Sequence, residues 1–189
     1  MQAAQTRQDV LAAAAELFAT AGWSGTTLTA LATRAGVAVE TVYAGLGSKK
    51  QVLRAVLDGS APVEADDPPG PRTTKEQRLR AATAAVADTH ERSAGVWRAL
   101  LEAASGDGEV EGWRVELERR RRREVAGTLE RVFGAAPDPL VVDLVWALLG
   151  PDVWLRLVVD AGWSREEYES SLADAVARLV GPVRRRRSA

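Results

Sequence analysis

Cysteine is absent from this sequence of 189 residues, and histidine occurs only once. Without cysteine the chain has no disulfide framework, no thiolate nucleophile and no cysteine-rich zinc site, and it fits a reducing compartment. The sequence also lacks a glycine-rich phosphate loop, a Ser-His-Asp arrangement and any metal-ligand spacing. We therefore expect neither an enzyme nor a bound cofactor or metal ion.

Long uninterrupted apolar runs are also missing. The most apolar stretch, residues 140–159, contains Asp143, Asp152 and Arg156, which are costly inside a bilayer. The alanine-rich residues 3–19 are interrupted by Asp9 and Glu16, so they do not form the apolar region of a signal peptide. We expect a cytoplasmic protein without a membrane partner.

A large charge of one sign is the third absence. The formal net charge is −1, so any contact with nucleic acid must come from a local patch. Residues 1–60 hold five basic and four acidic side chains, and two of the three lysines of the chain stand together there as Lys49 and Lys50. Affinity for DNA would depend on the placement of these charges and on dimerisation.

What the sequence does contain is helical periodicity. Apolar residues predict a helix over about 5–21 that ends at Gly22, and a second over about 28–35 in which Thr27 is the N-cap. Gly36 would end this second helix at a positive φ. A third helix spans 39–46, and a fourth begins near Ser48. Residues 1–60 are thus predicted to form a small domain built around a three-helix helix-turn-helix.

Residues 61–73 are rich in proline and acid and predict a linker. Beyond it, helical patterns cover 74–92, 94–105, 110–134, 138–161 and 165–180, and Gly150-Pro151 should kink or break the fourth of these. No alternation typical of strands occurs. The prediction is an all-α protein of about nine helices, with an effector-binding and dimerisation domain over 74–181 and a basic, disordered tail over 182–189.

Residues 26–49 combine two short helices, a glycine turn, a tyrosine and a lysine. In a helix-turn-helix the second helix enters the DNA major groove, and residues near its N-terminus reach base edges. Threonine hydroxyls, lysine ammonium groups and free helix N-termini bind phosphate oxygens. The predicted base contacts are Val39, Glu40 and Tyr43, and the predicted phosphate contacts are Thr27, Thr29, Thr41, Lys49 and Lys50.

The segment from Arg7 to Leu57 resembles the N-terminal domain of the TetR family of bacterial repressors. The matching motifs are AAxxLF followed by a Gly-aromatic pair, the TT cap, LAxxAGV, TVY and SKxxxL. The resemblance implies that Thr27, Thr41 and Lys49 approach phosphates, that Tyr43 lies against the DNA backbone or a thymine methyl group, and that Val39 and Glu40 read bases. The chain departs from the family pattern at Gly45, Leu46 and Gly47.

Glu40 has two interpretations. Its carboxylate could accept a hydrogen bond from a cytosine amino group, or it could be a solvated charge that stabilises a helix N-terminus. Val39 offers only apolar contact, so hydrogen-bonded base recognition by this helix is expected to be sparse.

A helix-turn-helix of this size contacts one half-site of an operator. A dimer is therefore expected to span a palindromic operator with half-sites about one DNA turn apart. In the TetR family the last two helices form a four-helix bundle between subunits. Residues 140–159 are apolar nearly all round, which predicts one face toward the domain and one toward a partner. The predicted interface residues are Val145, Trp146, Leu149, Trp154, Leu157, Tyr168, Leu172, Val176 and Leu179.

The preceding helices would enclose a pocket for a small-molecule effector, because ligand pockets are apolar with a few polar groups. The residues predicted to line it are Val86, His90, Trp97, Leu100, Leu101, Trp113, Leu117 and Arg121. Arg119–Arg123 are five consecutive arginines, of which Arg121 falls on the buried stripe of its helix. It could form a salt bridge, extend its head to solvent from a buried stem or hold an anionic effector.

Together these features predict a dimeric, ligand-responsive transcriptional regulator, acting as a repressor on double-stranded DNA. The alternative is a helical, dimeric small-molecule-binding protein that has lost sequence-specific DNA binding.

Overall fold

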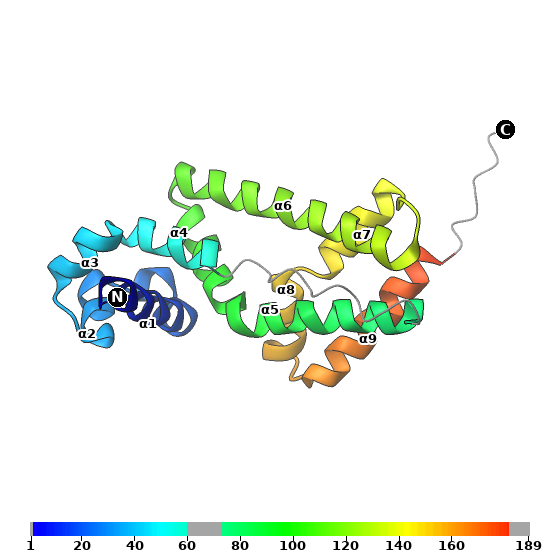
Figure 1. The fold of residues 1–189 in the computed structure, drawn as a ribbon, viewed down its shortest axis with the longest axis horizontal. Coiled ribbons are helices and arrows are strands. Elements are labelled where there is room, and N and C mark those ends of the chain that lie inside the picture. The colour runs from blue at the N-terminus through cyan, green and yellow to red at the C-terminus, as the bar shows by residue number, and fades with distance from the viewer. Residues whose placement is uncertain (1, 60–72, 182–189) are drawn as a thin grey trace. The chain divides into compact units, whose positions relative to one another are not determined.

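The structure is a computed structural model that describes residues 2–59 and 73–181. Within these ranges it consists of helices joined by short turns, without strands (Figure 1). The all-α prediction is confirmed. The predicted tail and, apart from Thr73, the predicted linker lie outside the described residues. None of the described helices combines the length and the apolar character needed to cross a membrane.

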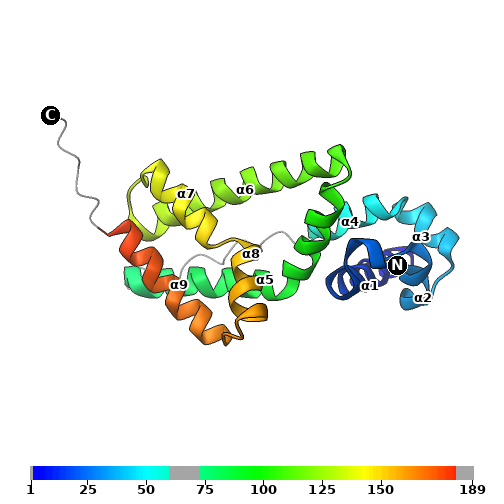
Figure 2. The same cartoon turned by 180° about the vertical axis from the view of Figure 1, so that it is seen from behind.

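The described residues form two compact units, one of residues 2–59 with 91–116 and one of residues 73–90 with 117–181. The first unit begins with α1 (Gln2–Gly25), α2 (Leu28–Ala35), α3 (Val39–Leu46) and α4 (Lys49–Gly59), which Figure 2 shows from behind. Gly22, where the first helix was predicted to end, kinks α1 with a φ of 70°, and the helix continues to Gly25. The same unit includes the end of α5 (Lys75–Ala104) and the start of α6 (Gly108–Phe133).

Residues 91–116 were expected in the second domain, but they pack with the helix-turn-helix. Gly95 of α5 shows how close this packing is, since a Cβ atom there would lie 2.6 Å from the Cβ of Ala19 in α1. Apolar side chains from both segments form one core. Its fully buried members include Phe18, Leu31, Val42, Leu53, Val96, Leu100 and Val110.

The prediction of two helices over 74–92 and 94–105 is wrong, because α5 runs without a break. Neither proline nor a left-handed residue interrupts it at Ser93.

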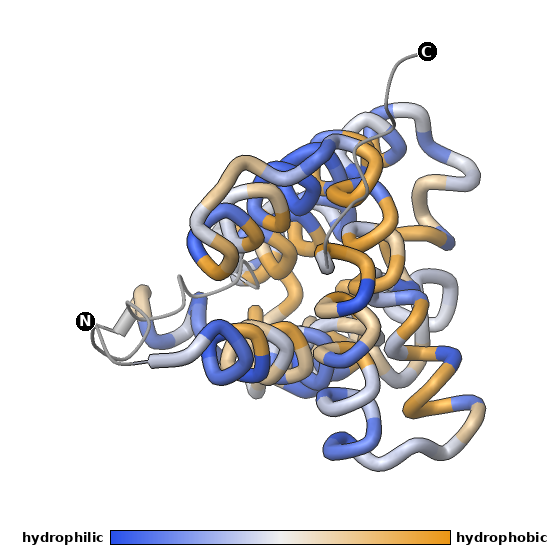
Figure 3. Tube along the Cα trace, turned by 90° about the vertical axis from the view of Figure 1, so that its right-hand side faces the viewer, coloured by the Kyte–Doolittle hydropathy of each residue, from blue (hydrophilic) through white to orange (hydrophobic). Residues whose placement is uncertain are grey.

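The predicted helix over 138–161 is divided at Gly150-Pro151, as expected, into α7 (Pro139–Leu148), α8 (Pro151–Trp154) and the π-helix η1 (Leu155–Asp160). The second unit ends with α9 (Arg165–Val180), which opens with a capping box between Ser164 and Glu167. Figure 3 shows apolar and polar residues alternating along the helices.

Candidate nucleic-acid interface

Thr26 and Thr27 direct their hydroxyls in opposite directions along the chain. The buried Thr26 donates from Oγ1 to the Gly22 carbonyl oxygen over 2.7 Å. The exposed Thr27 accepts at Oγ1 from the Ala30 amide over 3.1 Å and so caps α2, as predicted. A hydroxyl that accepts in this way can still donate its own hydrogen. Thr27 therefore retains one donor for an acceptor outside the protein.

The turn from α2 to α3 is built on Gly36. Its φ is 69°, a left-handed conformation in which glycine carries no Cβ penalty. The Gly36 amide donates to the Thr33 carbonyl and the Val37 amide to the Ala32 carbonyl. These bonds satisfy the last carbonyls of α2 and set the direction in which α3 leaves it.

Helix α3 has one buried anchor and an exposed face. Val42 is buried in the core, while Glu40, Thr41 and Tyr43 are exposed, Tyr43 to 65%. Val39 is half-buried. The N-cap residue, Ala38, makes no side-chain capping bond, so the positive end of the helix dipole is open to an anion. This exposed face combines a carboxylate, a hydroxyl and a phenol beside a helix N-terminus that has no side-chain cap.

Gly47 is one of the glycines that depart from the family pattern, and the structure explains why a glycine stands there. Gly47 follows α3 with a φ of 80°, and a Cβ atom there would collide with the amide oxygen of Gln51. That oxygen accepts from the Ser48 amide over 2.8 Å and orders the start of α4. A larger residue at this position would displace Gln51.

Lys49 lies against the protein. Its ammonium donates to the carbonyl oxygens of Trp23, over 2.8 Å, and Thr26, over 2.9 Å, and it lies 4.0 Å from the centroid of the Trp23 ring. Burial lowers the pKa of Lys49, opposed by the nearby Glu102 carboxylate. Two of three donor hydrogens are thus engaged in joining α4 to the end of α1, and one remains for a phosphate.

Lys50 contacts two carboxylates at the start of α6. Its ammonium lies 3.0 Å from Oδ2 of Asp107 and 2.6 Å from Oε2 of Glu109. Arg54, one turn later on α4, pairs with Asp58 and Glu116 and lies over the Trp113 ring. The basic face of α4 is therefore partly neutralised within the unit.

Glu102 is a residue that sequence analysis did not single out. Its carboxylate accepts from the backbone amides of Trp23, over 2.7 Å, and Ser24, over 3.1 Å, just after the break at Gly22. Hydrogen bonding with the Ser24 side chain and with these two amides lowers the pKa of Glu102. Trp23 and Ser24 are 79 and 78 positions from Glu102 in the sequence, so no local pattern could have predicted the contact.

The residues predicted to line an effector pocket do not all belong to one unit. Trp97, Leu100, Leu101 and Trp113 belong to the first unit, and Val86, His90, Leu117 and Arg121 belong to the second. In the first group Leu101 is exposed, and Trp97 and Leu100 are core residues. The common pocket stays a prediction.

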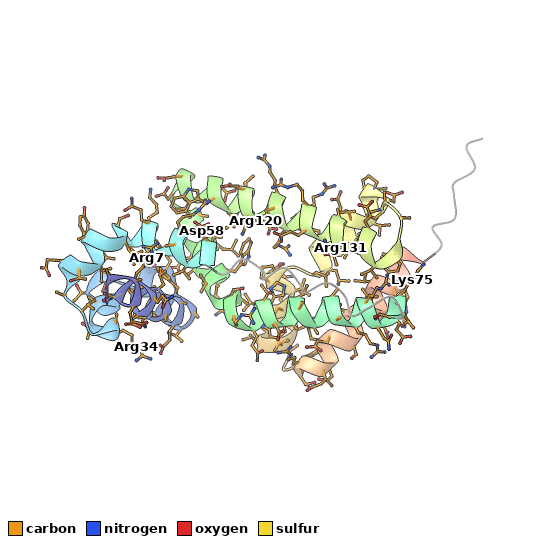
Figure 4. All side chains as sticks on the ribbon, viewed as in Figure 1. Arg7, Arg34, Asp58, Lys75, Arg120 and Arg131 are labelled. Atoms are coloured by element: carbon orange, nitrogen blue, oxygen red, sulfur yellow. The ribbon has the colours of Figure 1, made fainter. Side chains whose placement is uncertain are left out.

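Arg121 and His90 both bind the carboxyl end of α7. Arg121 donates to the carbonyl oxygens of Leu149, over 2.9 Å, and Trp146, over 3.2 Å, and pairs through Nε with Glu118 over 3.1 Å. His90 Nε2 lies 3.0 Å from the same Leu149 oxygen. The break at Gly150-Pro151 leaves these carbonyls without helical partners, and the two side chains take their place. Figure 4 labels Arg120 and Arg131 on the same helix, α6.

The predicted dimer residues are mostly core residues of the second unit. Trp146, Leu157 and Leu179 are half-buried, and the Trp146 indole donates to Glu118 over 2.9 Å. The remaining six are buried within the unit: Val145, Leu149, Trp154, Tyr168, Leu172 and Val176. Because these six are already shielded from water, they have little area left to bury against a second copy.

Residues 10–56 match the family model described as "Bacterial regulatory proteins, tetR family". Over these residues the chain is similar to the TetR family of bacterial regulatory proteins. The matched segment covers α2, α3 and most of α1 and α4, the helices that form the helix-turn-helix.

Solved structures share the fold over nearly the whole chain. A transcriptional regulator from Rhodococcus sp. is 18% identical with a TM-score of 0.72, over 92% of this chain and 95% of that one. A TetR-like regulator from Rhodococcus sp. is 20% identical with a TM-score of 0.64, over 93% and 96%. A member of the TetR regulator family from Streptomyces coelicolor is 23% identical with a TM-score of 0.53, over 93% and 90%. No curated protein sequence matches the chain.

Proposed function

We propose that the regulator is a cytoplasmic, dimeric repressor that binds a palindromic operator with α3 in the major groove. The observation that carries the proposal is the exposed face of α3, where Glu40, Thr41 and Tyr43 stand on a helix anchored by the buried Val42. In this proposal Val39 and Glu40 contact bases and Tyr43 contacts the DNA backbone or a thymine methyl group. Thr27, Thr29, Thr41, Lys49 and Lys50 contact phosphates.

Selection from a pool of random duplexes at moderate salt tests this proposal. A recovered palindrome with half-sites about one turn apart supports a dimeric regulator. The alternative, a ligand-binding protein without sequence-specific DNA binding, is favoured by the engagement of Lys49 and Lys50 with protein acceptors. It predicts that no sequence is enriched at any salt concentration.

Replacing Tyr43 is expected to weaken operator binding. Tyr43→Ala removes an exposed ring from α3, and one good contact to DNA is worth about 1–3 kcal/mol, so the Kd should rise about tenfold or more. The measurement is a fluorescence anisotropy titration with the selected duplex. Tyr43→Phe keeps the ring and isolates the hydroxyl. Because the side chain is exposed, both variants should keep the wild-type Tm, and an unchanged Kd for Tyr43→Ala would remove α3 as the reading helix.

We place the dimer contact on the exposed apolar side of α7. Leu140 is 73% exposed and Leu144 is 55% exposed, and residues four apart lie on one face of a helix. A second copy would bury this stripe together with parts of Trp146, Leu157 and Leu179.

Introducing a charge on this stripe should dissociate the dimer. Leu144→Glu would leave a carboxylate in an apolar contact, and central interface residues contribute about 2 kcal/mol or more, so the dimer Kd should rise about thirtyfold. Sedimentation velocity across a concentration series measures this. Ala161→Glu adds the same charge at an exposed position after η1 and should leave the dimer intact. Equal dimer constants for both variants would place the interface elsewhere.

A small-molecule effector would act through the helical second unit. Binding that favours a form unfit for the groove would weaken operator affinity. Helices α5 and α6 each contribute residues to both units, so a ligand that displaces either helix also displaces residues packed against the helix-turn-helix.

A further inference from the structure

The Lys50 ammonium is held where two elements distant in sequence meet. Lys50 is the second residue of α4, just after the α3–α4 turn, and its partners Asp107 and Glu109 are at the start of α6. The Lys50 side chain is 30% exposed, so the pair is open to solvent. Both carboxylates raise the pKa of Lys50, Glu109 most strongly.

Asp107 has a second role that ties this pair to the position of α6. Its Oδ1 atom accepts from the backbone amides of Glu109, over 2.9 Å, and Val110, over 3.3 Å, and so caps α6. Its other oxygen accepts from Lys50 over 3.0 Å. One carboxylate therefore joins the first turn of α6 to the first turn of α4.

A carboxylate pair and a DNA phosphate are both anionic partners for a lysine. Both offer anionic oxygens, and an ammonium on the first turn of a helix is suited to either. Solvent-exposed ion pairs are weak, so Lys50 can exchange one partner for the other at little cost.

We propose that Asp107 and Glu109 determine the affinity of the regulator for DNA by competing with a phosphate for Lys50. The proposal rests on the DNA-binding function proposed above. In the structure the Lys50 ammonium contacts both carboxylates, and it would contact a phosphate in exchange for them. α6 is one continuous helix from Gly108 to Phe133. An effector that displaces α6 would therefore move Asp107 relative to Lys50, and this would change how strongly Asp107 competes with a phosphate for Lys50.

The test removes the two competing charges and keeps the fold. Asp107→Asn retains a good N-cap for α6, and Glu109→Gln retains the length of the side chain. The Kd of the double variant for the operator duplex recovered by selection, and for a duplex of random sequence, is compared with that of the wild type over a salt series. We expect the Kd to fall about fivefold at low salt, and the log–log salt slope to steepen by about 0.9 for each phosphate gained per subunit.

Two controls separate this competition from a general change of charge. Glu111→Gln removes one charge from the same turn of α6, where Glu111 pairs with Arg114, and it should leave the Kd within about twofold of the wild type. Lys50→Gln should cancel the gain in the double variant. An equal gain with Glu111→Gln, a gain that survives Lys50→Gln, or weaker binding by the double variant would overturn the proposal.

If the proposed DNA-binding function is wrong, the same experiment gives a different result. If neither the wild type nor the double variant enriches any duplex, the regulator does not bind DNA, and the competition proposal falls with it. Binding by the double variant alone would support the proposal in its strongest form. Wild-type binding without a gain in the double variant refutes the competition and leaves the DNA-binding function standing.

Discussion

Arg121→Leu should lower the free energy of unfolding by about 3 kcal/mol. The guanidinium is 20% exposed, and its partner Glu118 is 19% exposed, so the substitution leaves a mostly buried carboxylate without its cation. It also removes the donors to the Trp146 and Leu149 carbonyl oxygens. Urea denaturation followed by circular dichroism, at one protein concentration, measures the change.

Arg123→Leu is the matched control for this prediction. Arg123 belongs to the same run of arginines on α6 but is exposed, and surface substitutions usually change stability by about 0.5 kcal/mol or less. If the two variants unfold at the same urea concentration, Arg121 does not stabilise the end of α7. A large loss for Arg121→Leu alone would make this arginine a structural residue and not an effector contact.

Stability should also fall in acid because of His90. Burial lowers the pKa of His90 to about 4, the Arg121 charge acts in the same direction, and the hydrogen bond with the Leu149 oxygen opposes them. In an unfolded chain histidine titrates near pH 6.5. Between these values the unfolded chain binds a proton that the folded chain does not. The contribution to stability is therefore complete above about pH 6.5 and is lost as the pH falls toward 4.

The expected loss from His90 is about 3 kcal/mol at pH 4. Carboxylates titrate in the same range, so the wild type is compared with His90→Gln, which keeps a hydrogen-bond donor and cannot be protonated. Urea denaturation of both proteins from pH 7 to pH 4 should show the wild type losing about 3 kcal/mol more than the variant. Parallel curves would mean that His90 is not held neutral in the folded protein.

Most of the features that could be predicted from the sequence depend on interactions between residues close together in the chain. The cap at Thr27, the left-handed turn at Gly36, the bounds of α3 and the break at Gly150-Pro151 each follow from residues within a few positions of one another. Hydroxyl caps, glycine conformations and the missing proline amide act over one turn of helix. Such features can be identified before any tertiary contact is known.

The contacts of charged side chains were harder to predict from the sequence. Lys49 and Lys50 were predicted to contact phosphates, yet in the structure their ammonium groups contact carbonyl and carboxylate oxygens. Glu102 was not identified at all. Long polar side chains can reach several partners, and the one they contact depends on which helices meet.

Burial in the last helices could not be assigned from periodicity alone. Tyr168, Leu172 and Val176 form an apolar stripe on α9, and the pattern is the same whether a stripe faces its own domain or a second subunit. The structure places all three in the protomer core and leaves Leu140 and Leu144 of α7 exposed.

The sequence by itself determined the helices, the helix-turn-helix and the family resemblance, because hydrophobic period, capping residues and glycine turns act locally. Tertiary structure decided that residues 91–116 pack with the DNA-binding helices, that Lys50 faces Asp107 and Glu109, and that Arg121 and His90 complete the end of α7. Each of these contacts joins residues 25 or more positions apart. No local preference specifies such a pair, because it forms only when the packing of whole helices brings the two side chains together.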